Sequence, residues 1–165
     1  MNQEALRENI SLEVKVTDRC NQSCFHCMNS DGLENRGENL DCYQFVKKLT
    51  QWSESYGQSP YQINEIRMTG GEPLLNLEGV ITIAKACQSL QIRSGINTNG
   101  TFLDESVASI LREAKLETVK ISFDSLDEAI LRKMRGPQAS LSKTLAGIRN
   151  SIDFSFQTIL RFTLC

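Results

Sequence analysis

The sequence predicts an α/β fold: a partial (β/α) barrel of parallel strands with outer helices. Stretches of strand character alternate along the chain with stretches whose apolar residues recur every three or four positions. A strand, helix, strand unit joins parallel strands by a right-handed crossover, so this alternation indicates one parallel sheet covered by helices. The 165 residues suffice for one domain with a core. The predicted strands cover residues 12–16, 63–69, 92–98, 118–123 and 154–164.

The first elements follow in that order. Apolar and polar residues alternate over 12–17, which is the period of a strand with one buried face. Apolar residues then recur at helical spacing over 40–56, and Gly57 and Pro60 mark the end of this helix. The second strand, 63–69, runs directly into a Gly-Gly-Glu-Pro turn.

The later elements repeat the alternation. Asp104 is expected to cap the helix that follows the third strand. Ser125 and Glu128 have the spacing of a capping box at the start of a short helix, which Gly136 and Pro137 end. The other helical faces cover residues 77–87, 107–114 and 141–152.

The composition narrows the class of protein. Lys and Arg number 18 against 20 Asp and Glu, a formal net charge of -2, so nothing steers the chain toward nucleic acid or an anionic membrane. Apolar residues make up 40%, which is typical of a folded domain. The N-terminus lacks the apolar core of a secretory signal, and no apolar run approaches the ~18 residues of a membrane span. We therefore expect a cytoplasmic protein with neither nucleic acid nor membrane as a partner.

The six cysteines are unevenly distributed. Cys20, Cys24 and Cys27 lie close together, directly after the first predicted strand. Three thiolates at this spacing can hold a 4Fe-4S cluster and leave one iron without a protein ligand. An open coordination position is what distinguishes catalytic from structural metal sites. Cys42 and Cys87 lie on apolar helical faces and are expected to be buried as small hydrophobic residues.

Two other interpretations of the cysteine loop remain open. Cys24 and Cys27 alone have the spacing of a thioredoxin-type redox pair, but Cys20 has no role in a simple dithiol couple. The three cysteines with His26 could instead bind zinc. His26 adjoins Cys27, which makes simultaneous ligation awkward, and no second cysteine pair follows at zinc-ribbon spacing.

Three segments carry a resemblance to a known family: Cys-Asn-Gln-Ser-Cys-Phe-His-Cys at 20–27, Met-Thr-Gly-Gly-Glu-Pro at 68–73, and Ile-Ser-Phe-Asp-Ser at 121–125. They are similar to the radical S-adenosylmethionine (radical SAM) superfamily, from about Leu12 to the end of the chain. In that family the cysteines bind a 4Fe-4S cluster, S-adenosylmethionine (SAM) chelates the open iron, and the reduced cluster cleaves SAM to a 5′-deoxyadenosyl radical that abstracts hydrogen from substrate. The resemblance implies a flavodoxin- or ferredoxin-type reductant and a small-molecule or peptide substrate.

The resemblance also implies SAM contacts near the cysteines. His26 takes the place of the aromatic residue whose backbone meets the adenine, although its side chain could simply pack beside the cluster. Gly70 and Gly71 would let the backbone approach the ligand closely. Glu72 would accept a hydrogen bond from the SAM ammonium group.

Further contacts are implied on the later strands. Ser122 takes the family's position for a polar contact to the ribose or methionine end of SAM. Asp124 is a second candidate there, with a helix cap as its alternative. Asn99 would line the pocket or form an ordinary Asn-Gly turn. Arg161 would bind a carboxylate of SAM or substrate, or form an ion pair inside the barrel.

Two subfamilies are similar to this chain. Residues 18–21 and 67–73 resemble the GTP cyclase of molybdenum cofactor synthesis, but Glu13 stands where that enzyme has a GTP-contacting arginine, and a carboxylate would repel a triphosphate. Residues 160–164 are more similar to peptide-modifying maturases, which carry auxiliary iron-sulfur clusters in a C-terminal extension.

About five of the family's six βα units are present. The domain 1–165, with residues 1–10 as a lead-in, is therefore expected to be a truncated radical SAM core. A non-catalytic iron-sulfur or zinc-binding module remains an alternative.

Overall fold

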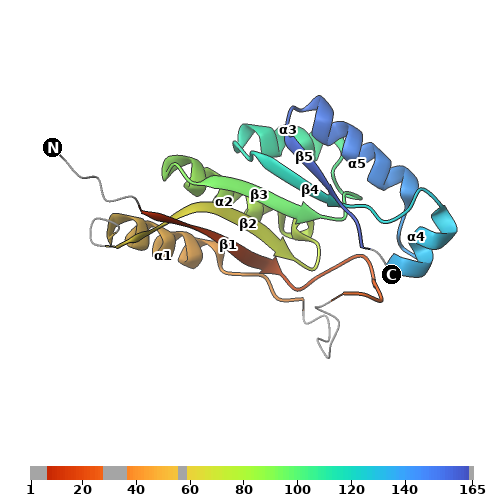
Figure 1. The fold of residues 1–165 in the computed structure, drawn as a ribbon, viewed down its shortest axis with the longest axis horizontal. Helices are drawn as coiled ribbons and strands as arrows, with labels where there is room; N and C mark the ends of the chain where they lie inside the picture. Colours follow the sequence, from red (N-terminus) through yellow and green to blue (C-terminus); the bar gives the residue numbers. More distant parts are fainter. Residues whose placement is uncertain (1–6, 28–36, 56–58, 164–165) are drawn as a thin grey trace.

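A computed structural model describes residues 7–27, 37–55 and 59–163 of the chain. Within these ranges five parallel strands form one sheet in chain order, as Figure 1 shows. The sheet does not close, so the predicted α/β partial barrel is confirmed, with β1 and β5 at its edges. The strands are β1 (Glu8–Thr17), β2 (Tyr61–Gly70), β3 (Arg93–Thr98), β4 (Thr118–Ser122) and β5 (Gln157–Arg161).

Helices connect successive strands. Asp104 accepts a hydrogen bond from the Val107 backbone N–H and caps its helix, as predicted. The helices are α1 (Cys42–Glu54), the short 3-10 helix η2 (Pro73–Asn76), α2 (Leu77–Ser89), α3 (Glu105–Glu113), α4 (Glu128–Arg135) and α5 (Leu141–Asp153).

The predicted capping box before α4 is wrong. Asp127 caps this helix, and its carboxylate accepts the first free backbone N–H groups. Ser125 accepts a hydrogen bond from the Asp127 backbone instead, while Glu128 bonds to the Leu141 backbone N–H. Ser125 and Glu128 have the spacing of a capping box, but Asp127, which lies between them, takes the N-cap position.

The sheet has one apolar and one polar face. Alternate strand residues pack with the helices into a single buried cluster, which includes Cys42 and Cys87 as predicted. The positions between them point to the opposite face and are mostly polar, among them the register partners Glu13 and Arg67. The strand residues of the core include Val14, Val16, Ile66, Met68, Ile96, Val119 and Ile121.

Three helices end in the same unusual way. A residue just beyond α2, α3 and α5 adopts the left-handed conformation without being glycine: Gln91 has φ 57°, Lys115 has φ 62° and Ser155 has φ 58°. The next backbone N–H groups return to carbonyls of the helix, which satisfies its last turn. For this reason β5 starts at Gln157 and not at 154, where the aromatic and β-branched content had placed the strand.

The N-terminal strand begins at Glu8, within the span expected as a lead-in. Among the described residues, no helix has the length and apolar character that crossing a membrane requires.

Candidate cofactor site

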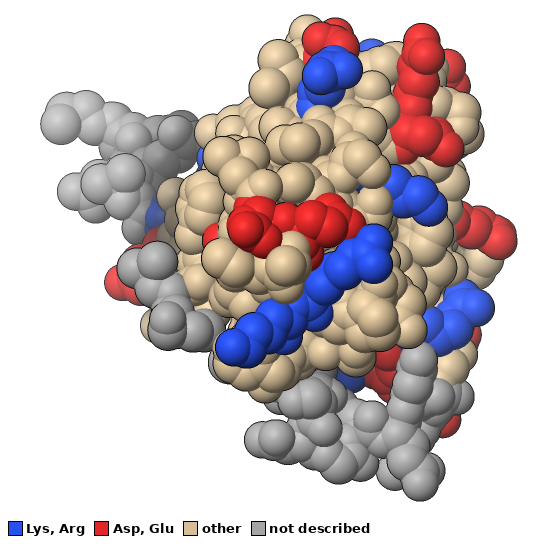
Figure 2. Space-filling view, turned by 90° about the vertical axis from the view of Figure 1, so that its right-hand side faces the viewer, with Lys and Arg blue, Asp and Glu red and all other residues tan. Residues whose placement is uncertain are grey.

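The chemically unusual segments meet in one pocket of about 600 Å³ at the carboxyl ends of the strands. This is the edge where parallel α/β sheets bind ligands, because the loops that follow the strands converge there. Figure 2 faces this end of the molecule and shows basic and acidic side chains next to one another. Of the predicted site residues, the pocket lining contains Cys20, Cys24, His26, Cys27, Gly70, Gly71, Glu72, Asn99, Ser122 and Arg161.

The two glycines hold the β2 turn against the chain leaving β1. Gly71 N–H donates to the Thr17 carbonyl at 2.9 Å, and Glu72 N–H donates to the Arg19 carbonyl at 2.7 Å. A Cβ on Gly70 would lie 2.3 Å from the Thr17 carbonyl oxygen, and one on Gly71 would lie 2.1 Å from that of Arg19. Gly70 also has φ +150°. Close backbone packing beside the cysteine loop therefore requires both glycines, whatever they do toward a ligand.

Glu72 joins neighbouring strand ends. Its carboxylate is buried and accepts hydrogen bonds from the Thr98 hydroxyl at 2.6 Å, the Asn99 backbone N–H at 2.8 Å and the Leu74 backbone N–H at 3.2 Å. Burial raises the pKa of this carboxyl, while the hydrogen bonds act in the opposite direction. The side chain is thus a fixed acceptor in the pocket wall.

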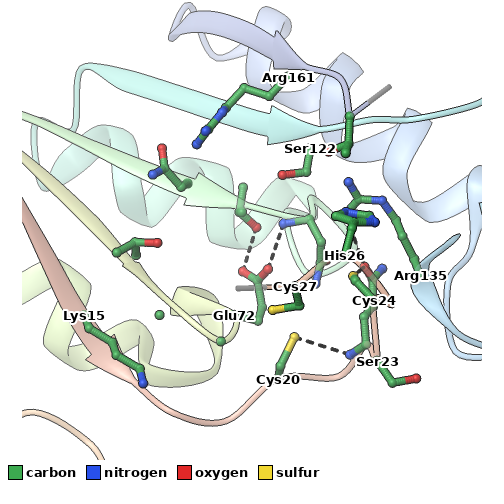
Figure 3. Close-up of a pocket in the computed structure, with 18 of the residues that line it drawn as sticks. Lys15, Cys20, Ser23, Cys24, His26, Cys27, Glu72, Ser122, Arg135 and Arg161 are labelled. Carbon is green, nitrogen blue, oxygen red and sulfur yellow. Dashed lines mark hydrogen bonds between the residues drawn. The ribbon is translucent and has the colours of Figure 1, made fainter. Parts of the chain in front are cut away.

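The three cysteines are half-buried, free of disulfides and arranged around the pocket (Figure 3). Burial raises the pKa of the Cys24 thiol to about 11, and the positive charge of Arg135 opposes this shift. Burial also raises the pKa of Cys20, and the negative charge of Glu72 adds to the effect. Positive charge close by favours the thiolate form of these cysteines, and iron would supply that charge when bound.

The spacing of the ligands bears on the kind of metal. Among the described residues, no three His, Cys, Asp or Glu side chains surround a point where one ion could sit. A structural zinc needs such a tetrahedral set. Three thiols that line one pocket are a donor set that an iron-sulfur cluster takes, with one thiolate per iron.

His26 borders the cysteines with a half-buried ring. Its Nδ1 lacks a hydrogen-bond partner among the described residues, and its Nε2 lies 3.9 Å from Asp124 Oδ2. The ring packs edge-to-face against Phe25. The backbone contact to an adenine stays a prediction.

Asp124 lies behind His26, outside the pocket lining. Its side chain is fully buried and pairs with Arg135, whose Nε lies 2.6 Å from Asp124 Oδ2. The carboxylate also accepts a hydrogen bond from the Thr163 backbone N–H. Asp127, not Asp124, caps α4, so the alternative role as a cap was wrong. Sequence reasoning missed Arg135, because only the fold brings it against Asp124.

Asn99 links the end of β3 to the cysteine loop. Its side-chain amide donates to Asn21 Oδ1 at 2.8 Å and its carbonyl accepts from Thr101. Asn99 thus lines the pocket, and its side-chain Oδ1 also accepts the Thr101 backbone N–H across the Asn-Gly turn, while a contact to SAM stays a prediction.

Ser122 and Arg161 are register partners on β4 and β5 and form the other side of the pocket (Figure 3). Among the described residues, no carboxylate pairs with Arg161, so the alternative of an ion pair inside the barrel finds no partner there. Its contact with SAM or substrate stays a prediction.

Comparison with known proteins agrees with this geometry. The family model of the radical SAM superfamily matches residues 14–164, so the chain belongs to the radical SAM superfamily. Members of this superfamily are enzymes that use a 4Fe-4S cluster and SAM.

Curated relatives include a probable GTP 3',8-cyclase of Methanococcus aeolicus, 32% identical over 93% of this chain, and the GTP 3',8-cyclase of Corynebacterium glutamicum, 35% identical over 86%. The chain spans 49% of the first relative and 37% of the second, about half their length or less.

Solved structures share the fold at lower identity. Native anSMEcpe with bound AdoMet has a TM-score of 0.69 and 22% identity, covering 91% of this chain and 42% of that one. Streptococcus suis SuiB bound to the precursor peptide SuiA has a TM-score of 0.72 and 18% identity, covering 93% and 32%. These likenesses support the partial barrel.

Proposed function

We propose that this chain is the cofactor-binding core of a radical SAM enzyme, in which Cys20, Cys24 and Cys27 hold a 4Fe-4S cluster and SAM occupies the pocket beside it. The observation that carries the proposal is the placement of the three thiols and the Gly-Gly-Glu turn around one pocket. When bound, the reduced cluster supplies the electron that cleaves SAM to the radical that abstracts hydrogen.

We assign the binding and orientation of SAM to the chain's own residues. Each carboxylate oxygen has room for two hydrogen bonds, and Glu72 Oε2 accepts one, from Asn99, among the described residues. This leaves an acceptor for the ammonium group of SAM. Asn97 Oδ1 and His26 Nδ1 are buried without partners in the described part of the chain, and both residues line the pocket. Buried polar atoms without partners are what a ligand would satisfy.

Arg161 is a cation of the pocket without a carboxylate partner among the described residues, which favours an acidic ligand group. Arg161 lies opposite the Gly-Gly-Glu turn with Ser122 beside it, and we assign it to a carboxylate of SAM or of substrate. Asp124 acts through Arg135 and not directly, since Arg135 lines the pocket and Asp124 does not. The reductant is of flavodoxin or ferredoxin type, and a reducing cytoplasm suits these thiols.

Two substrate classes remain as candidates, a peptide and a nucleotide. The curated relatives favour the GTP cyclase reaction. Against it, Glu13 occupies the place of a GTP-contacting arginine, and Arg67 on the neighbouring strand is neutralised by Glu13 and Glu65. Glu13, Glu65 and Arg67 together carry a net negative charge, which would repel a triphosphate on this face of the sheet. The polar face of the sheet therefore favours a substrate other than GTP, and a peptide is the substrate we propose.

Anaerobic reconstitution with iron and sulfide tests the proposal. We expect iron uptake, a brown chromophore and formation of 5′-deoxyadenosine from SAM with dithionite. Cys24→Ala should lose iron and SAM cleavage, whereas Cys87→Ala, which removes a thiol buried in the core, should retain both. Retention of iron by Cys24→Ala would refute the cluster assignment. Incubation with GTP and with candidate peptides then separates the two substrate classes.

A further inference from the structure

The cysteine loop is fastened to the carboxyl end of α4. Ser23 N–H donates to the Arg135 carbonyl at 3.1 Å, and Phe25 N–H donates to the Met134 carbonyl at 3.1 Å. Gly136, at φ +86°, ends the helix so closely that a Cβ there would lie 2.2 Å from Ser23 Oγ. The backbone on both sides of Cys24 therefore depends on the position of α4.

The side chain of Arg135 reaches the same loop. The residue is only 5% exposed, and its Nε donates to Asp124 Oδ2 at 2.6 Å. Its Nη1 lies 3.5 Å from Gln22 Oε1, which also accepts from the Cys24 thiol at 3.9 Å. A planar guanidinium can serve several acceptors at fixed angles, which an ammonium group cannot do.

The charges around the cysteines are unequal. Arg135 lies on the side of Cys24, whereas the buried carboxylate of Glu72 lies on the side of Cys20, as Figure 3 shows. Water is largely excluded from Arg135 and Asp124, so their charges act with little screening.

We propose that Arg135 is a positioning residue that fixes the cysteine loop and that the Asp124–Arg135 pair sets the reduction potential of the cluster. The inference rests on the proposed cluster. Reduction adds negative charge to the cluster, and a fixed positive charge beside one of its thiolates favours the reduced form. Asp124 holds the guanidinium in place and partly offsets its charge.

Redox titration followed by electron paramagnetic resonance tests this inference on the reconstituted 165-residue chain. Arg135→Gln should shift the midpoint potential to lower values and Asp124→Asn to higher values, with the larger shift for Arg135→Gln. Arg135→Lys should keep the potential close to that of the unaltered chain but retain less iron, because it keeps the charge and loses the planar contacts. Arg132→Gln is the matched control. It removes the same charge from the same helix, but this side chain is 53% exposed, so no shift is expected.

The outcomes separate the two claims. If the unaltered chain binds no cluster, the proposed function fails and this inference with it. If the cluster forms but both variants of the pair shift the potential in the same direction, or not at all, the inference alone is overturned. If Arg135→Gln retains no iron, the other two variants decide. A higher potential for Asp124→Asn together with an unchanged potential for Arg135→Lys supports the inference, and any other result overturns it.

Discussion

Replacement of Gly71 by alanine should loosen the cysteine loop by displacing the β2 turn. The new Cβ would lie 2.1 Å from the Arg19 carbonyl oxygen and 2.8 Å from that of Asp18, both backbone atoms that cannot rotate away. Relief of this overlap breaks the hydrogen bonds from Gly71 to Thr17 and from Glu72 to Arg19. At about 1 kcal/mol each, with about 1–3 kcal/mol for overpacking, we expect a loss of about 3–5 kcal/mol in the free energy of unfolding.

Equilibrium unfolding in urea, together with iron content after reconstitution, measures this effect. Gly37→Ala is the matched control, because Gly37 also lies beside Arg19. Its Cβ would meet only side-chain atoms at 3.9 Å, so the change costs only the left-handed conformation at φ +69°. That cost is about 1 kcal/mol. A Gly71→Ala chain that unfolds within about 0.5 kcal/mol of the unaltered chain and keeps its iron would refute the reasoning.

Two further predictions concern the scaffold. Lys115→Gly should raise the free energy of unfolding by about 0.5–1 kcal/mol, because glycine adopts φ 62° without strain. Lys85→Gly, within α2, is the control and should lower the free energy of unfolding by about 1 kcal/mol. Thermal melting in which both variants lose stability would contradict this prediction. Hydrogen bonds from Arg67 hold the pKa of Glu65 at about 2, below its ordinary 4.5, so this pair stabilises the fold above pH 4.5 and the contribution is lost as pH falls toward 2. Glu65→Gln should therefore cost about 2–3 kcal/mol at pH 7, and the difference from the unaltered chain should disappear near pH 2; a difference independent of pH would count against the pair.

The order and direction of the strands were predictable because each depends on local periodicity. Alternation over 12–17 and helical spacing over 77–87 identified β1 and α2, and the conversion of βα alternation into a parallel sheet needs only the crossover rule. The boundaries of β5 were not predictable in this way, because the left-handed turn at Ser155 is made by a residue with no strong preference for it.

The parts of the candidate site that lie in one short motif were predictable from the sequence. The parts that depend on contacts between residues far apart in sequence were not. The cysteine loop and the Gly-Gly-Glu turn each stand in a few consecutive residues. Arg135 reaches Gln22 across 113 positions of sequence, so no local pattern could join them. The glycines illustrate an intermediate case: their presence was noted, but their contact with the Thr17 and Arg19 carbonyls depends on the register of β1 and β2.

The most direct measurement of the central claim is the Mössbauer spectrum of the chain reconstituted with iron-57, recorded before and after addition of SAM. Three cysteine ligands leave a single iron for the amino and carboxylate groups of SAM, so one iron site alone should change its isomer shift. A spectrum that SAM leaves unaltered, or iron bound as isolated ions and not as a cluster, would contradict the account.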